Sequence, residues 1–124
     1  MATQADVRKI ALALPGTVEA KGHFAFEVAV KEKSRGFAWA WKERVLPKKP
    51  RVPNPEVLAV RVANLMDKDL LLQADPKKYF TEPHYNGYPA VLVRLKEIKV
   101  PELRALLKDA HEIMSSPPKA KKRA

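Results

Sequence analysis

The side chains that could do chemistry are few in this chain, and none stands in a catalytic arrangement. The three histidines, His23, His84 and His111, lie far apart, and none has a carboxylate or another histidine at metal-ligand spacing. The serines lack the context of a nucleophile elbow, and four glycines leave no phosphate-cradling loop. Cysteine is absent, which excludes a thiolate nucleophile. We therefore expect no enzyme activity, no metal, no cofactor, and structural or surface roles for the histidines.

Basic segments carry the strongest functional signal. The 124 residues include 24 Lys and Arg against 14 Asp and Glu, a formal net charge of +10. An excess of this size favours polyanionic partners such as nucleic acid. The residues predicted to contact phosphates are Lys31, Lys33, Arg35, Lys42, Arg44, Lys48, Lys49 and Arg51. The alternative interpretation is a pair of solvated loops that discourage edge-to-edge aggregation.

These cations fall in two segments, an expected hairpin tip over 31–36 and a proline-rich loop over 42–55. The two segments flank one strand, and a strand of about five or six residues would hold them roughly 17–20 Å apart. We therefore expect phosphate contacts at two separate places. A lysine-rich tail, 117–124, adds four further positive charges and is expected to be disordered.

Aromatic residues alternate along two neighbouring segments: Phe24, Phe26, Phe37, Trp39 and Trp41. An exposed set could stack on the bases of single-stranded nucleic acid. A sheet that is covered by helices on one face instead buries its large alternating residues there. The alternation predicts that Phe37, Trp39 and Trp41 share one face and belong to the core.

The elements that position these residues follow from hydrophobic periodicity. Thr3 and Asp6 predict a capping box at the start of a first helix, which Pro15-Gly16 ends. Asp67 is the expected N-cap of a short second helix, and Pro101 suits the start of a strongly amphipathic third. Alternation predicts strands over 24–30, 37–41, 57–62, 79–82 and 90–96.

The order of these elements, α-β(3)-α-β(2)-α, predicts an antiparallel sheet with helices on one face, a two-layer α+β domain over residues 1–116. No apolar run approaches the roughly 20 residues that span a bilayer, and the N-terminal residues lack the apolar centre of a signal peptide. We therefore expect a cytoplasmic protein that does not bind membranes.

Several segments in order resemble the MmcQ/YjbR family over residues 3 to 115. They are Ala-Leu-Pro-Gly at 13–16, Glu19, His-Phe-Ala-Phe at 23–26, Phe-Ala-Trp-Ala at 37–40, His-Tyr-Asn-Gly-Tyr-Pro at 84–89 with the strand 90–95, and the helix around 102–107. The resemblance implies the α-β(3)-α-β(2)-α fold, a double-wing DNA-binding-like arrangement similar to CyaY and the type III secretion chaperones. It implies no catalytic residues. The segment 42–55 is longer and more basic than the short loop that the family leads us to expect.

Two functions follow as hypotheses. The first is a non-enzymatic nucleic-acid-binding protein, with DNA favoured over RNA, that contacts phosphates through its basic loops and tail. The alternative is a protein-binding adaptor or chaperone-like domain that uses a sheet face or a helix stripe.

Overall fold

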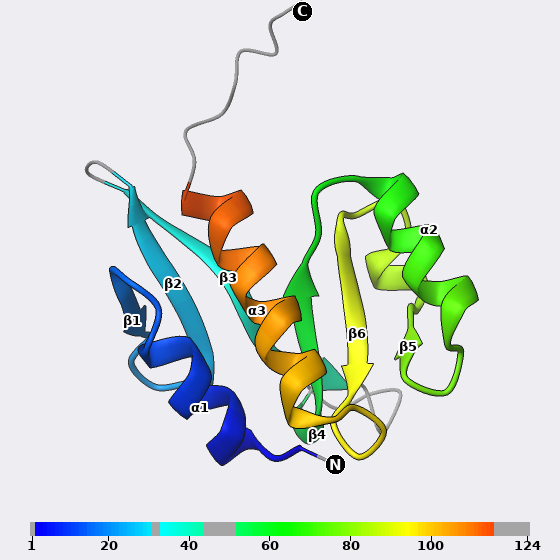
Figure 1. Cartoon of the computed structure of the whole chain (residues 1–124), viewed down its shortest axis with the longest axis horizontal. Coiled ribbons are helices and arrows are strands. Elements are labelled where there is room, and N and C mark those ends of the chain that lie inside the picture. The colour runs from blue at the N-terminus through cyan, green and yellow to red at the C-terminus, as the bar shows by residue number, and fades with distance from the viewer. Residues whose placement is uncertain (1, 31–32, 44–51, 116–124) are drawn as a thin grey trace, which may run out of the picture.

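A computed structural model describes residues 2–30, 33–43 and 52–115 (Figure 1). The expected α+β class and helix–strand order are confirmed, with one additional short strand after the first helix. The elements are α1 (Gln4–Leu12), β1 (Thr17–Glu19), β2 (Ala25–Val30), β3 (Lys33–Glu43), β4 (Val52–Arg61), α2 (Leu65–Ala74), β5 (Tyr79–Phe80), the 3₁₀ turn η1 (Pro83–Tyr85), β6 (Ala90–Arg94) and α3 (Val100–Ser115). The predicted tail, 117–124, lies outside the described residues.

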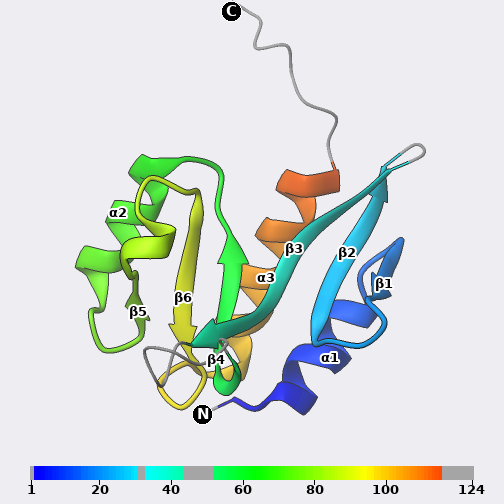
Figure 2. The same cartoon turned by 180° about the vertical axis from the view of Figure 1, so that it is seen from behind.

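The six strands form one antiparallel sheet in the order β1-β2-β3-β4-β6-β5. Helices α1 and α3 lie across one face, and α2 lies beside β5 and β6 (Figure 1). Seen from behind, β2 and β3 have no helix of the described residues in front of them (Figure 2). The sheet therefore has a helix-covered face and an open face.

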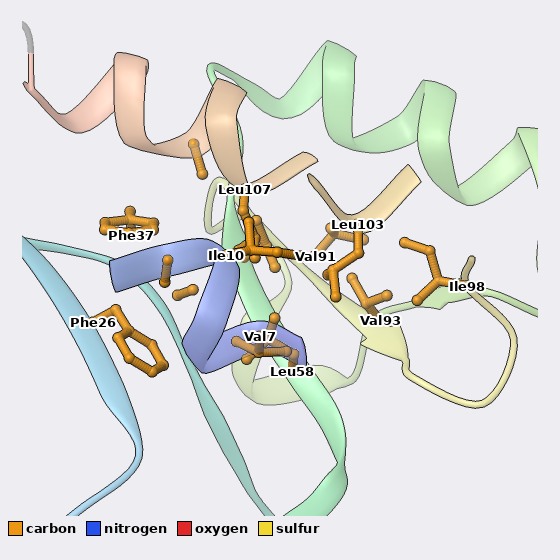
Figure 3. Close-up of a cluster of buried hydrophobic side chains, with 14 of the residues drawn as sticks. Val7, Ile10, Phe26, Phe37, Leu58, Val91, Val93, Ile98, Leu103 and Leu107 are labelled. Atoms are coloured by element: carbon orange, nitrogen blue, oxygen red, sulfur yellow. The ribbon is translucent and has the colours of Figure 1, made fainter. Parts of the chain in front are cut away.

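The main core lies between the sheet and the helices (Figure 3). Strands β4 and β6 supply Leu58, Val60, Val91 and Val93, which are fully buried, as their alternation predicted. The buried helix residues in this cluster are Val7, Ile10, Ala11, Leu103, Leu107, Ala110 and Met114. Their spacing of three and four residues is the apolar stripe of an amphipathic helix.

The helix starts are set by side-chain caps. The predicted capping box is present, since Thr3 Oγ1 accepts from the Asp6 amide at 3.3 Å and Asp6 Oδ2 accepts from the Thr3 amide at 3.0 Å. The short second helix is present as α2, but its predicted N-cap, Asp67, was wrong. Asn64 is its N-cap and accepts from the amide of Asp67 at 2.8 Å. Asp67 stands in the first turn, where a negative charge favours the helix dipole.

A β-bulge in β3 overturns the prediction that Phe37 shares a face with the tryptophans. Phe26 pairs with Ala38 and Glu27 pairs with Gly36, so Phe37 is an extra residue on β3. An extra residue reverses the side-chain alternation beyond it. Phe37 is fully buried in the main core, whereas Trp39 and Trp41 are partly buried in a smaller cluster on the open face.

The strands also extend further into the basic segments than the sequence predicted. Residues 33–36 of the expected tip belong to β3, and residues 42–43 and 52–55 of the expected loop belong to β3 and β4. Two prolines, at 53 and 55, fit within β4 because its pairing with β6 begins only at Val57. Before that residue β4 has one neighbour, and proline is tolerated on such an edge.

Candidate functional site

A hollow of about 430 Å³ lies on the open face beside Trp39. Small residues of β2 and β3 line it, Ala25 and Gly36 among them, and the aromatic rings of Trp39 and Tyr85 border it. A Cβ atom placed on Gly36 would lie 3.9 Å from the Trp39 ring. The small side chains therefore leave one side of the indole next to open space.

Trp39 is held in place by the turn η1. Its indole Nε1 donates to the hydroxyl of Tyr85 at 3.0 Å, across 46 positions of sequence. Both residues belong to a second hydrophobic cluster whose buried members are Val57, Ala59, Tyr85, Ala90 and Leu92. The hydrogen bond fixes the orientation of the ring that borders the hollow.

A second residue, Lys68, also holds the turn η1 in place. This lysine of α2 is 3% exposed, and its Nζ donates to the carbonyl oxygens of Tyr85 at 2.5 Å and Tyr88 at 3.0 Å. Burial lowers the pKa of Lys68, while nearby Asp69 acts in the opposite direction. A buried ammonium group needs such acceptors, so Lys68 is a structural anchor for the segment that carries Tyr85.

We predict that Lys68→Met lowers the free energy of unfolding by about 1–3 kcal/mol, because it removes two hydrogen bonds from a charged donor, although each carbonyl keeps a backbone amide as a partner. Loss of this anchor should also change the fluorescence of Trp39. Chemical denaturation and tryptophan emission spectra measure both effects. The matched control is Lys77→Met, at an exposed lysine, which should change neither the free energy of unfolding nor the tryptophan emission. An unaltered stability in the Lys68 variant would contradict the anchoring role.

The predicted phosphate-contacting residues do not form one cluster. Lys33 and Arg35 lie at one end of β3, opposite Val30 and Val28, and Lys42 lies near the other end. Lys42 follows Lys33 by nine positions of strand, a distance of at most about 30 Å, which is longer than the sequence suggested. Of the three, Lys42 borders the hollow. The other predicted contacts, Lys31, Arg44, Lys48, Lys49 and Arg51, lie outside the described residues.

The attachment of the basic segment 44–51 is nevertheless defined. Glu43 pairs with Val52, and Lys42 pairs with Pro53, so the segment leaves and rejoins the sheet at the Lys42 end of β3. Its sequence holds four Lys and Arg and no Asp or Glu. Four positive charges are thereby attached at the end of the strand that borders the hollow.

Other basic residues are engaged in structural contacts. Arg8 donates to Glu19 through Nε and Nη2, both at 2.9 Å, and this pairing lowers the pKa of Glu19. Lys78 donates to Glu102 at 2.8 Å, which raises the pKa of Lys78 and lowers that of Glu102. The first pair joins α1 to β1 and the second joins β5 to α3. These cations hold the helices to the sheet.

The histidines occupy separate environments. The His111 ring is buried, with Nε2 2.6 Å from the carbonyl oxygen of Pro15, and packs edge-on against Phe37 at 5.6 Å. Nε2 therefore carries the proton and donates, a structural role. His23 is exposed at the border of the hollow. The side chain of His84 is not described by the structure. In the described part of the chain, no three His, Asp or Glu residues are grouped so as to hold a metal ion.

The hollow and Lys68 were not predicted from the sequence, and Tyr85 was expected only to orient its own turn by hydrogen bonding and packing. The available signal was the resemblance, because three of its segments meet here. Segment 23–26 pairs with 37–40 across β2 and β3, and 84–89 supplies Tyr85. Lys68 had no sequence signal of its own, since a lysine in a short helix is ordinarily exposed.

The chain is thus a two-layer α+β domain whose antiparallel sheet leaves one face open around a tryptophan-bordered hollow. Comparisons with known proteins agree with this class. The uncharacterized proteins Rv2570 of Mycobacterium tuberculosis and Mb2600 of Mycobacterium bovis are each 40% identical to it over 119 residues, covering 89% of this chain and 86% of theirs. The chain belongs to the family of these mycobacterial proteins.

A solved structure has the same fold. The Deinococcus radiodurans protein DR2400, a DUF419 domain, superimposes with a TM-score of 0.71 over 98% of this chain and 86% of its own, at 23% identity. No family model matches the chain. Among the described residues, no helix is both long and apolar enough to cross a membrane.

Proposed function

We propose that this chain is a non-enzymatic, cytoplasmic nucleic-acid-binding protein of the MmcQ/YjbR family that favours DNA over RNA. The observation that carries the proposal is the tethering of the basic segment 44–51, through the Glu43–Val52 pair, at the Lys42 end of the open sheet face. The fold shared with the solved DUF419 domain is the α+β fold that the MmcQ/YjbR resemblance implies, and this agreement supports the proposal.

The chemistry of the segment suits phosphate. Arginine offers a planar fork of donors that matches a phosphate group, and lysine offers a compact point charge. Proline at positions 47 and 50 restricts the backbone between these cations, so fewer conformations are lost when they bind. Lys42 extends the positive charge from the segment to the border of the hollow.

Lys33 and Arg35 lie at the far end of β3, where they pair with Val30 and Val28 and so share the helix-covered face of the sheet. They supply a second and separate contact region, which a nucleic-acid backbone of several nucleotides is long enough to reach. Contacts of this kind position the protein but read no base sequence. Binding is therefore mainly electrostatic and weakly selective, and the basic tail adds to the attraction.

Fluorescence anisotropy with short labelled oligonucleotides tests the proposal. The full chain should bind at low salt, and the logarithm of its affinity should fall linearly with the logarithm of salt concentration, by about 0.9 per phosphate neutralised. Oligonucleotides of unrelated sequence should give similar curves. If neither DNA nor RNA binds at low salt, the proposal is wrong.

In that event the adaptor hypothesis would lead, because α2 presents an apolar surface. Met66 is 72% exposed, Leu70 60% and Leu65 46%. A cluster of this kind on a helix fits contact with another protein.

A further inference from the structure

We propose that the hollow on the open face receives an unpaired nucleobase against Trp39, which makes single-stranded nucleic acid the ligand. This inference rests on the proposed function and names its substrate class. The first argument is shape. In a duplex the flat faces of the bases are covered by their neighbours, and only edges and phosphates are exposed. An aromatic side chain beside a hollow becomes useful when a base can leave the stack.

The size of the hollow is suitable. Its volume of about 430 Å³ falls within the ordinary range of small-ligand sites. Ala25 and Gly36 keep it open because neither carries a side chain beyond Cβ. Ala25 pairs directly with Trp39 across β2 and β3, so the smallest residues lie beside the ring.

The charged side chains at the hollow favour different parts of a nucleotide, with the base inside the hollow and the phosphate outside it. Glu27 lines the hollow and pairs with Gly36, and a carboxylate there disfavours an anionic group. The same carboxylate can accept from the amino group of a base, as acidic side chains do from cytosine. Lys42, which also borders the hollow, lies next to the segment 44–51 and attracts the phosphate. The base thus enters beside Trp39 while its phosphate stays near Lys42.

The aromatic surface is preorganised. The hydroxyl of Tyr85 holds the indole nitrogen of Trp39, and Lys68 holds the carbonyl of Tyr85. A ring fixed before binding loses little conformational freedom when a base stacks on it. The chain of contacts runs from α2 through η1 to β3, so the site is supported by elements from both halves of the sequence.

Filling the hollow without altering Trp39 tests this inference. Gly36→Val adds a side chain beside the indole, where its Cβ meets the ring at an ordinary contact distance of 3.9 Å. Valine suits a strand, so the fold should be retained. Gly36→Ala is the smaller companion variant, which fills less of the hollow and tests the inference if the valine variant does not fold. Circular dichroism and thermal melts check both variants.

The probes are a labelled single-stranded DNA oligonucleotide and the duplex of the same sequence, at one low salt concentration. Wild-type protein should bind the single strand more tightly and show quenching of tryptophan fluorescence. Gly36→Val should weaken single-strand binding about tenfold, the scale of removing one stacked base, and Gly36→Ala should have a smaller effect. Neither should change duplex binding.

Two results would overturn the inference while leaving the proposed function intact. One is equal wild-type affinity for single strand and duplex. The other is single-strand binding by a folded Gly36→Val variant that matches the wild type. Absence of binding to both probes would instead overturn the proposed function and this inference together.

Discussion

Replacing Phe37 by alanine should lower the free energy of unfolding by about 3–5 kcal/mol, the usual cost of truncating a buried phenylalanine. The side chain has no exposed surface and packs edge-on against the ring of His111. It is also the extra residue of the β3 bulge, so its burial fixes which side chains of β3 face the helices and which face the open side of the sheet. Chemical denaturation measures the loss.

Trp41→Ala is the matched control on the same strand. Trp41 is partly buried, donates to Glu82 Oε2 at 3.3 Å and packs against Phe80 at 5.6 Å. Its truncation should cost clearly less than that of Phe37, because the second cluster is smaller. If the two variants lost equal stability, or if Trp41→Ala were the worse, the division into a main core and a lesser cluster would be wrong.

The largest expected effect on binding comes from the basic segment. Replacing Lys48, Lys49 and Arg51 together by alanine should weaken nucleic-acid binding and reduce the salt slope by up to about 2.7, at about 0.9 for each phosphate that is no longer neutralised. The melting temperature should hardly change, since lysine and arginine side chains in a proline-rich segment seldom contribute to a core. Anisotropy titrations at several salt concentrations give the slope.

A second triple variant separates position from net charge. Lys9, Lys77 and Lys108 are exposed and do not line the hollow; they lie on α1, before β5 and on α3. Their joint replacement by alanine removes the same charge and should leave most of the affinity and slope intact. Equal losses in the two triple variants would mean that the protein binds through its overall charge, without a defined surface.

Hydrophobic periodicity was sufficient to predict much of the fold. Leu58, Val60, Val91 and Val93 alternate and are buried together, because each strand runs without interruption through the sheet. The strand β1 was missed because three residues are too few to establish a period. The tryptophans were assigned to the wrong face because a single bulged residue reverses alternation, and Gly36, which stands beside that bulge, was interpreted as the end of a hairpin tip.

The candidate site was harder to predict for a different reason. Trp39, Gly36 and Tyr85 meet through pairing and a hydrogen bond that spans 46 positions. Local patterns carry no information about such contacts. The basic residues were visible as charge, yet their distribution over both ends of β3 depends on how far the strand extends into segments that read as loops.

An amide NMR titration of the full chain with a short DNA single strand will show whether nucleic acid binds on the open face of the sheet. We expect the shifts to concentrate on Ala25, Glu27, Gly36, Lys42 and the indole Nε1 of Trp39, the part of the sheet around the hollow. Amides of α1 and α3, on the opposite face, should remain unshifted. Shifts confined to α2 and α3, or no shifts at saturating DNA and low salt, would mean that nucleic acid does not bind on the open face.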